Sequence, residues 1–259
     1  MLLAVDIGNT QIVFGVHRDG KWHNHWRIQT DPLKTSDEYE VIFRSLFMAA
    51  EISRTEIKRI IICSVVPLLV RSFDEMFKSL FTEAEITVVN PDIYPLLPLK
   101  ILNPYEIGTD LVANAVAAYK KFGTLTTVVD FGTALTFTTI GVNAEIKGVA
   151  IAPGLNTAVA ALAGKTAQLP YVHLVAPPSV LGANTTQAIQ AGIVFGFSGL
   201  VDSILERTEK ELGEKISVIA TGGLSSVIAP FSKYIQHVDI MLTLDGLVHI
   251  GDFVAGSKT

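Results

Sequence analysis

The residues best suited to chemistry stand at the tip of a hairpin near the start of the chain. Asp6 ends an apolar run, and Gly8, Asn9 and Thr10 form a turn before the next apolar run. Glycine lets the main chain approach a charged ligand, and the Asn and Thr side chains offer hydrogen-bond donors. The Asp6 carboxylate could hold a divalent cation that offsets phosphate charge. Phosphate binding is therefore one interpretation, and an ordinary hairpin turn of the Asp-x-Gly-Asn type is the other.

A second segment with the same plan begins near the middle of the chain. Asp130 follows an apolar run, and Gly132 and Thr133 form the turn before another, 124 residues after Asp6 in a chain of 259 residues. The repetition indicates an internal duplication in which each half opens on the same hairpin. Paired acidic hairpins of this kind resemble those of the superfamily of sugar kinases, heat-shock ATPases and actin.

This resemblance implies an α/β fold of two ribonuclease-H-like lobes of duplicated topology with a nucleotide cleft between them. We expect the first lobe at residues 1–121 and the second at 122–259. A closing helix over 245–255 is expected to pack back on the first lobe.

Two further segments combine chemistry with a helix start. Residues 108–121 predict a helix whose first turn carries Asp110, and an acidic residue there also stabilises a helix N-terminus without any catalytic role. Gly222 and Gly223 follow the predicted strand 216–220 and precede another helix. Glycines between a strand and a helix suit nucleotide binding, and a tight turn explains them nearly as well.

The helix that follows the first hairpins carries a clear start signal. Thr35 and Glu38 form a capping-box pattern, which predicts a helix to about residue 50. We expect Val41, Ile42 and Phe47, together with Leu46, on its apolar side.

Composition excludes several classes of protein. Apolar residues make up 49% and charged residues 17%, which favours covered sheets and excludes a disordered chain. The net charge of -5 offers no basic surface for nucleic acid. The mean hydropathy is +0.43, but the most apolar run, 60–70, contains Ser64 and Pro67 and is too short to cross a membrane. Because the start of the chain has no basic segment, we expect a cytoplasmic protein without a membrane partner.

Cys63 and the pair His23 and His25 are interpreted first as structural residues. Cys63 is the only cysteine and stands in an apolar strand, so we expect a buried core thiol, with a catalytic role as the lesser alternative. His23 and His25 share a face of a predicted strand and are interpreted as surface residues, with metal binding as the lesser alternative.

An ordered set of short motifs resembles the type III pantothenate kinases over nearly the whole chain. The matching segments are 6–10, 62–67, 103–104, 108–110, 113–118, 130–133, 153–154, 166–170, 182–185, 220–223 and 242–247. Each motif is modest, and their common order carries the resemblance.

The resemblance implies an enzyme that transfers the γ-phosphoryl group of ATP to the primary hydroxyl of pantothenate, the first step of coenzyme A synthesis. It implies that Asp110 is the general base. It also implies a homodimer, Mg²⁺ held near Asp6 through phosphate, and K⁺ or NH₄⁺ held by Asp130. The implied ATP-binding residues are Asp6, Ile7, Gly8, Asn9, Thr10, Gln11, Ile12, Val13, Gly132, Thr133, Gly222 and Gly223. The implied substrate-binding residues are Gly108, Thr109, Asp110, Leu111 and Thr185.

The chain departs from the family pattern at two positions. The family usually reads Gly-Ala-Asp-Arg where this chain has Gly108-Thr109-Asp110-Leu111, and leucine cannot hold an anion as arginine does. Val149 also replaces the second glycine of a Gly-Gly pair. Two alternatives to pantothenate phosphorylation therefore remain, a kinase of another small hydroxyl compound and a non-catalytic nucleotide-binding regulator. The intact Asp110 and both hairpins favour the kinase.

Overall fold

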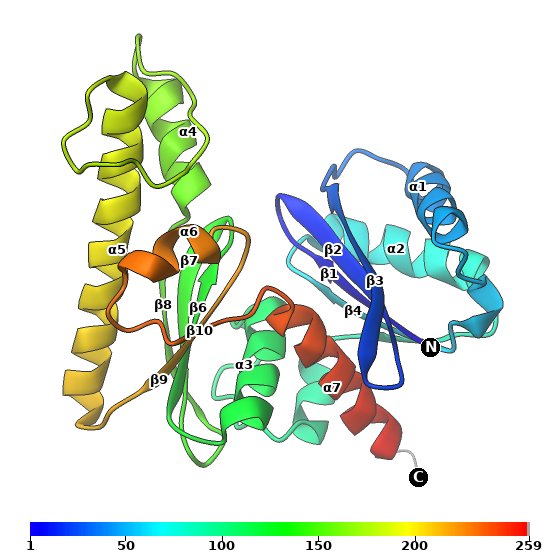
Figure 1. Cartoon of the computed structure of the whole chain (residues 1–259). Coiled ribbons are helices and arrows are strands. Elements are labelled where there is room, and N and C mark those ends of the chain that lie inside the picture. The colour runs from blue at the N-terminus through cyan, green and yellow to red at the C-terminus, as the bar shows by residue number, and fades with distance from the viewer. Residues whose placement is uncertain (258–259) are drawn as a thin grey trace. The chain divides into compact units, whose positions relative to one another are not determined.

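The computed structural model describes residues 1–257, which form two compact units (Figure 1). The first comprises Met1–Ala117 and the segment from Leu242 onward, and the second comprises Ala118–Met241. The first unit contains β1 (Leu2–Ile7), β2 (Gln11–Arg18), β3 (Lys21–Gln29), α1 (Ser36–Ala49), β4 (Arg59–Ser64), α2 (Pro67–Leu80), β5 (Glu85–Val88), α7 (Leu242–Gly256) and the start of α3 (Thr109–Phe122). Two short 3₁₀ helices, η1 (Arg54–Glu56) and η2 (Pro91–Leu96), also lie in this unit.

The first sheet has the strand order β3-β2-β1-β4-β5. Strands β1, β2 and β3 form an antiparallel meander, whereas β4 and β5 run parallel to β1. In the parallel pair Asp6 stands beside Cys63, and Ile7 stands beside Ser64. This register brings the first hairpin to the same edge of the sheet as the end of β4.

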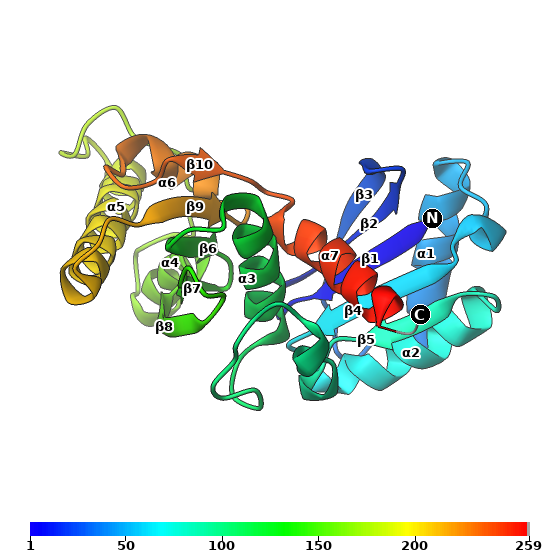
Figure 2. The same cartoon turned by 90° about the horizontal axis from the view of Figure 1, so that it is seen from below.

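Helices cover both faces of this sheet (Figure 2). On one face α1 and α2 pack aromatic side chains against β2, and the rings of Phe14 and Phe43 stack with centroids 4.1 Å apart. The capping box of Thr35 and Glu38 is present, as predicted. The prediction that Val41 faces the core is wrong, because its side chain is 64% exposed. Tyr39, Phe43 and Phe47 form the buried stripe of α1 instead, each one helical turn from the next.

The other face of the first sheet is covered by α7, which contacts β1 and β4. Glycines allow this close approach: a Cβ at Gly251 would lie 2.9 Å from the Ile61 side chain, and one at Gly246 would overlap the backbone of Ala113 in α3. A helix at the end of the chain is thus built into the first unit.

The second unit contains the end of α3, followed by β6 (Thr126–Phe131), β7 (Ala134–Ile140), β8 (Ile146–Pro153), α4 (Leu155–Lys165), α5 (Thr185–Leu212), β9 (Ser217–Thr221), α6 (Ser225–Ile228), the 3₁₀ helix η3 (Ala229–Phe231) and β10 (His237–Val238). Its sheet has the order β8-β7-β6-β9-β10. Here β6 takes the place that β1 has in the first sheet, with an antiparallel hairpin on one side and a parallel strand on the other. The predicted duplicated α/β topology is confirmed.

The long helix α5 packs with α4 over one face of the second sheet. It begins with Asn184, whose side chain accepts a hydrogen bond from the Gln187 amide at 2.9 Å, and ends at Gly213, whose φ is 70°. By length and composition α5 is also long and apolar enough to cross a membrane, and 44% of its most apolar stretch is buried. One such helix is weak evidence for a membrane span.

Candidate functional site

The tip of the first hairpin is braced by its own backbone and by Thr30. The Gly8 amide donates to the Gln11 carbonyl at 3.0 Å, which closes the turn. The Thr30 hydroxyl donates to the Gly8 carbonyl at 2.6 Å, and the Thr30 amide donates to the Thr10 carbonyl at 3.0 Å. These bonds hold the tip in a fixed shape, as a phosphate-binding turn requires. Thr30 was missed from sequence because its partners are 20 or more residues away.

The implied ATP-binding residues of this hairpin include both buried and exposed side chains. Ile7 and Ile12 are fully buried in the core, so a ligand could reach only their main chain. Asn9, Thr10 and Gln11 are exposed at the tip, where their polar side chains can meet a ligand.

The Asp6 carboxylate is hydrogen-bonded to a buried thiol. Cys63 Sγ donates to Asp6 Oδ1 at 3.2 Å, and Cys63 is fully buried, as predicted. Burial raises the pKa of the Cys63 thiol well above its ordinary value, and the negative charges of Asp6 and Asp110 raise it further. The thiol therefore stays protonated and acts as a donor that orients Asp6.

The start of α3 is tied to the end of β4. Thr109 Oγ1 accepts from the Ser64 amide and donates to the Ser64 carbonyl, both at 3.1 Å. Since Ser64 stands beside Ile7 in the parallel pair, this anchor places Asp110 near Asp6. The hydroxyl of Thr109 is thus engaged with the backbone of β4.

Asp110 itself is held in a mostly buried setting. Its Oδ1 accepts from the Leu111 amide at 2.8 Å, and a Cβ on Gly108 would come 2.5 Å from this oxygen, so glycine leaves room for the carboxylate. Burial raises the pKa of Asp110 above its usual range, against the opposing effect of the hydrogen bond from Leu111. A carboxylate with a raised pKa is a stronger base, which suits proton acceptance. The Leu111 side chain is buried and offers no polar group.

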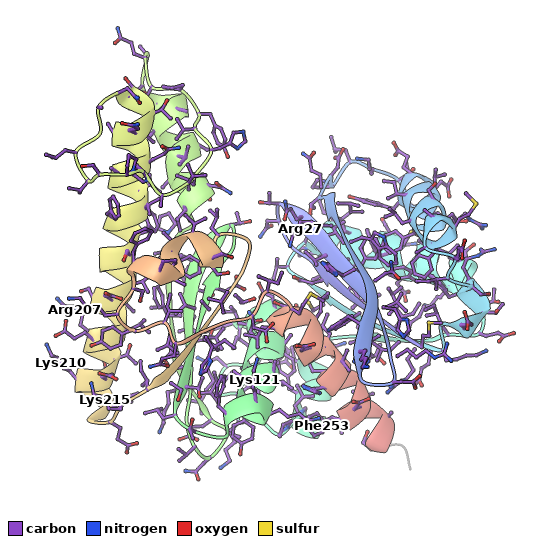
Figure 3. All side chains as sticks on the ribbon, viewed as in Figure 1. Arg27, Lys121, Arg207, Lys210, Lys215 and Phe253 are labelled. Atoms are coloured by element: carbon purple, nitrogen blue, oxygen red, sulfur yellow. The ribbon has the colours of Figure 1, made fainter. Side chains whose placement is uncertain are left out.

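Arg27 of β3 is a basic residue on the same sheet face as Asp6. Asp6 pairs with Val13, and Val13 pairs with Arg27, so all three side chains point to one side. Arg27 is exposed (Figure 3). Within residues 1–257 it makes no ion pair. His23 and His25 are exposed on the same strand, as expected of surface histidines.

The second unit brings its predicted site residues together around Asp130. Gly222 has a φ of 87°, and a Cβ there would lie 2.8 Å from Asp130 Oδ1 and 2.7 Å from the Phe131 carbonyl. The Ser225 hydroxyl donates to the Gly222 carbonyl at 2.7 Å and holds this turn. Only glycine fits here without strain, so the Gly222 turn lies directly against the carboxylate.

The tip of the second hairpin is braced by the segment after β8. The Gly154 amide donates to the Thr133 carbonyl at 3.1 Å, and the Thr157 hydroxyl donates to the same carbonyl at 2.7 Å. A Cβ on Gly154 would overlap the carbonyls of Gly132 and Thr133, so glycine is needed at this contact. This bracing parallels that of the first hairpin by Thr30.

Thr185 is the first residue of α5 in the second unit, whereas Gly108 to Leu111 belong to the first. The implied substrate-binding residues therefore come from both units of the chain.

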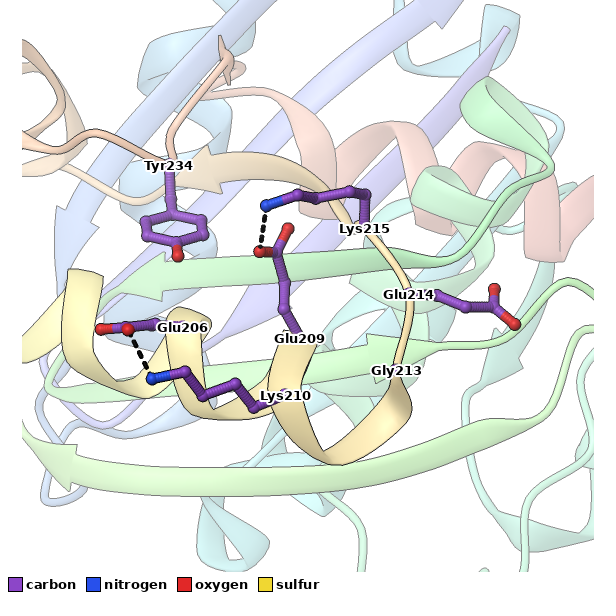
Figure 4. A pocket seen from close by; sticks show the side chains of 7 residues that line it. All are labelled: Glu206, Glu209, Lys210, Gly213, Glu214, Lys215 and Tyr234. Carbon is purple, nitrogen blue, oxygen red and sulfur yellow. Dashed lines mark hydrogen bonds and ion pairs between the residues drawn. The ribbon is translucent and has the colours of Figure 1, made fainter.

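The described residues include no ready-made metal site of several side chains. Among residues 1–257, three or more His, Cys, Asp or Glu side chains nowhere gather in a metal-binding group. A hollow of about 400 Å³ at the end of α5 is lined by Glu206, Glu209, Lys210, Gly213, Glu214, Lys215 and Tyr234 (Figure 4). Its lysines pair with its glutamates, Lys210 with Glu206 at 2.6 Å and Lys215 with Glu209 at 2.7 Å. It contains none of the predicted site residues, so we assign it no part in the chemistry.

Comparison with known proteins identifies the family. The family model for type III pantothenate kinases matches residues 2–207. A type III pantothenate kinase from Citrifermentans bemidjiense is 44% identical over 247 residues, which cover 95% of this chain and 97% of that protein. The chain belongs to the type III pantothenate kinase family. The motif order noted in the sequence is therefore confirmed as a family match.

Solved structures agree with this family assignment at the level of the fold. A protein of the Baf family of transcriptional activators from Campylobacter jejuni has a TM-score of 0.60 at 16% identity, covering 98% of this chain and 99% of that one. An inorganic polyphosphate/ATP-glucomannokinase from Arthrobacter has a TM-score of 0.52 at 14% identity, covering 99% and 98%. Identities this low show the shared fold alone. This chain thus shares its duplicated topology with the glucomannokinase.

Proposed function

We propose that this protein transfers the γ-phosphoryl group of ATP to the primary hydroxyl of pantothenate, the first step of coenzyme A synthesis. Family membership supports this reaction. The observation that carries the proposal is Asp110, a mostly buried carboxylate with a raised pKa at the helix start anchored beside the first hairpin.

In this proposal Asp110 accepts a hydrogen bond from the attacking hydroxyl, aims it at the phosphorus and takes its proton as the new P–O bond forms. The bond to ADP breaks at the same time, and ADP leaves with its electron pair. Positioning and charge compensation dominate phosphoryl transfer, so a rigidly held carboxylate is sufficient. The Thr109 to Ser64 hydrogen bonds supply this rigidity.

Both hairpins are proposed to bind the phosphates of ATP through residues 6–13 and through Gly132 and Thr133, with Gly222 and Gly223 beside the adenosine. Oxygen ligands suit Mg²⁺ near Asp6 and K⁺ or NH₄⁺ near Asp130, since hard cations prefer carboxylate and carbonyl oxygens. Such cations supply positive charge that offsets the charge of the transferred group. The close fit of Gly222 to Asp130 leaves backbone carbonyls beside this carboxylate.

Leu111 leaves the acceptor pocket without the arginine that the family usually has. We propose Arg27 as a basic side chain that meets phosphate at the first hairpin, because it lies in the same row of the sheet as Asp6. Two strand spacings separate these residues, about 10 Å, a distance that an arginine and a bound phosphate can bridge.

We further propose a cytoplasmic homodimer. The edge strand β8 carries Val149 and Ile151, which are 40% and 69% exposed, and Leu162 of α4 is 37% exposed. An exposed edge strand with apolar side chains is a surface on which another chain can pair. Light scattering of the wild type and of Ile151→Lys tests this, since the charged side chain should yield monomers.

The purified protein, incubated with ATP, Mg²⁺ and K⁺ and a panel of small alcohols, tests the reaction. We expect pantothenate-dependent ADP release and a phosphorylated product by mass spectrometry. If another alcohol alone is phosphorylated, the protein is a kinase with a different acceptor. Nucleotide binding without any phosphorylated product would support the regulator to which Leu111 points, and would overturn the proposal.

A further inference from the structure

Tyr94 is a buried tyrosine whose hydroxyl lacks a hydrogen-bond partner. It lies in η2, is 4% exposed, and its Oη forms no hydrogen bond with any of residues 1–257. Buried tyrosine hydroxyls normally have a partner, because an unsatisfied polar group is costly. We therefore infer that a bound ligand supplies the hydrogen-bond partner of the Tyr94 hydroxyl.

Tyr94 lies on a segment that leaves the first sheet at the same end as the residues assigned to catalysis. Burial raises the pKa of Tyr94 to about 12, and the negative charge of Asp110 contributes to this shift. The Val89 amide donates to the Ile62 carbonyl at 2.8 Å, so β5 ends beside Cys63. Two residues after Val89, η2 begins at the end of the sheet where Thr109 is bonded to Ser64. Cys63 at this end of the sheet donates to Asp6 of the first hairpin. Tyr94 remains a neutral phenol, able both to donate and to accept a hydrogen bond.

The two residues that flank Asp110 offer no free polar side chain to orient an acceptor. Leu111 is buried and apolar, and the Thr109 hydroxyl is already bonded to the backbone of Ser64. In addition to the primary hydroxyl that reacts, pantothenate has a secondary hydroxyl and an amide carbonyl. Both groups need hydrogen-bond partners when they are buried in a binding site. A neutral phenol is a suitable donor to either oxygen.

We propose that the Tyr94 hydroxyl hydrogen-bonds to this second oxygen of the acceptor alcohol and so selects acceptors that carry one. The inference rests on the proposed function, since it takes Asp110 as the base of a kinase. The family usually has an arginine at the position of Leu111. In this protein the neutral Tyr94 hydroxyl would contact the acceptor in place of that charged side chain.

The test is Tyr94→Phe, which keeps the ring and removes only the hydroxyl. We expect the KM for pantothenate to rise about 5- to 50-fold, the usual range for leaving one polar group unpaired. The KM for ATP should not change. The melting temperature should stay equal or rise, because the hydroxyl has no partner to lose in the free protein.

Two tyrosines provide matched controls. The Tyr39 hydroxyl donates to the Asp31 carbonyl and accepts from the Asp31 amide, both at 2.9 Å, so Tyr39→Phe should lower the melting temperature and leave the KM for pantothenate unchanged. Tyr105 is 84% exposed, and Tyr105→Phe should change neither quantity.

Substrate analogues locate the contact. A pantothenate analogue without the secondary hydroxyl should be a poorer substrate of the wild type, and Tyr94→Phe should no longer distinguish it from pantothenate if the phenol meets that hydroxyl. If discrimination persists while the KM still rises, the contact is with the amide carbonyl.

The remaining outcomes separate this inference from the proposed function. An unchanged KM in Tyr94→Phe, with an active wild type, overturns the inference and leaves the kinase intact. A melting temperature lowered as in Tyr39→Phe also overturns it, since the hydroxyl then has a protein partner. If the wild type phosphorylates a different alcohol and Tyr94→Phe raises its KM, pantothenate is the wrong acceptor and the inference holds. If no acceptor is phosphorylated, both are wrong.

Discussion

Replacing Asp110 with Asn should separate catalysis from stability. The amide oxygen of Asn can still accept the 2.8 Å hydrogen bond from the Leu111 amide, so the shape of the site should persist. The neutral amide cannot take a proton from the attacking hydroxyl. We expect kcat to fall by about 10²- to 10⁴-fold, equivalent to about 3 to 5 kcal/mol of transition-state stabilisation. ATP affinity should change little.

The same substitution should stabilise the fold at neutral pH. Because burial raises the pKa of Asp110 in the folded protein, the folded state holds this proton more tightly than the unfolded chain does. Below the pKa that Asp110 has in the unfolded chain, its carboxyl is protonated in both states and does not change the free energy of unfolding. As the pH rises through the folded pKa, the ionised, buried carboxylate destabilises the fold. Asp110→Asn should therefore melt above the wild type at pH 7, and the difference should vanish below about pH 4.

Steady-state kinetics, calorimetry with ATP and thermal unfolding at several pH values measure these effects. Asp37 is the matched control, because it is exposed and occupies the same second position of α1 that Asp110 occupies in α3. Asp37→Asn should leave turnover unchanged and lower stability by about 0.3–1 kcal/mol. A loss of turnover below about tenfold in Asp110→Asn would refute the base assignment. If Asp110→Asn is less stable than the wild type at neutral pH, the Asp110 carboxylate stabilises the N-terminus of α3.

Three further substitutions probe other parts of the protein. Activity should require K⁺ or NH₄⁺ and respond poorly to Na⁺, and Asp130→Ala should abolish this dependence; equal rates in Na⁺ and K⁺ would contradict the assignment. Leu111→Arg should lower the KM for pantothenate if the guanidinium meets the substrate carboxylate, or raise kcat if it meets the transferred group. Loss of activity in that variant would mean instead that the pocket is built around leucine. Gly222→Ala should destabilise the protein by about 1–3 kcal/mol in chemical unfolding, since alanine is strained at a φ of 87° and its Cβ would meet the Phe131 carbonyl; wild-type stability would show that this turn can move.

Local sequence patterns were sufficient to predict most of the elements and the duplication. The capping box of Thr35 and Glu38 predicted the start of α1, and the spacing of Asp6 and Asp130 predicted two sheets of equal topology. The apolar surroundings of Cys63 predicted its burial. Each of these features is a short motif, or the repetition of one along the chain, so it can be recognised without knowledge of the fold. The order of motifs also identified the family.

The tertiary structure alone decided which side chains meet. The parallel pairing of β1 with β4 puts Cys63 on Asp6, and the anchoring of Thr109 on Ser64 brings Asp110 to the same edge of the sheet. Packing also decided which face of α1 is buried, and there the prediction for Val41 was wrong because helical periodicity does not specify which of two apolar stripes meets the sheet. The partnerless hydroxyl of Tyr94 could not be foreseen, since a missing hydrogen bond depends on every residue that surrounds it in space.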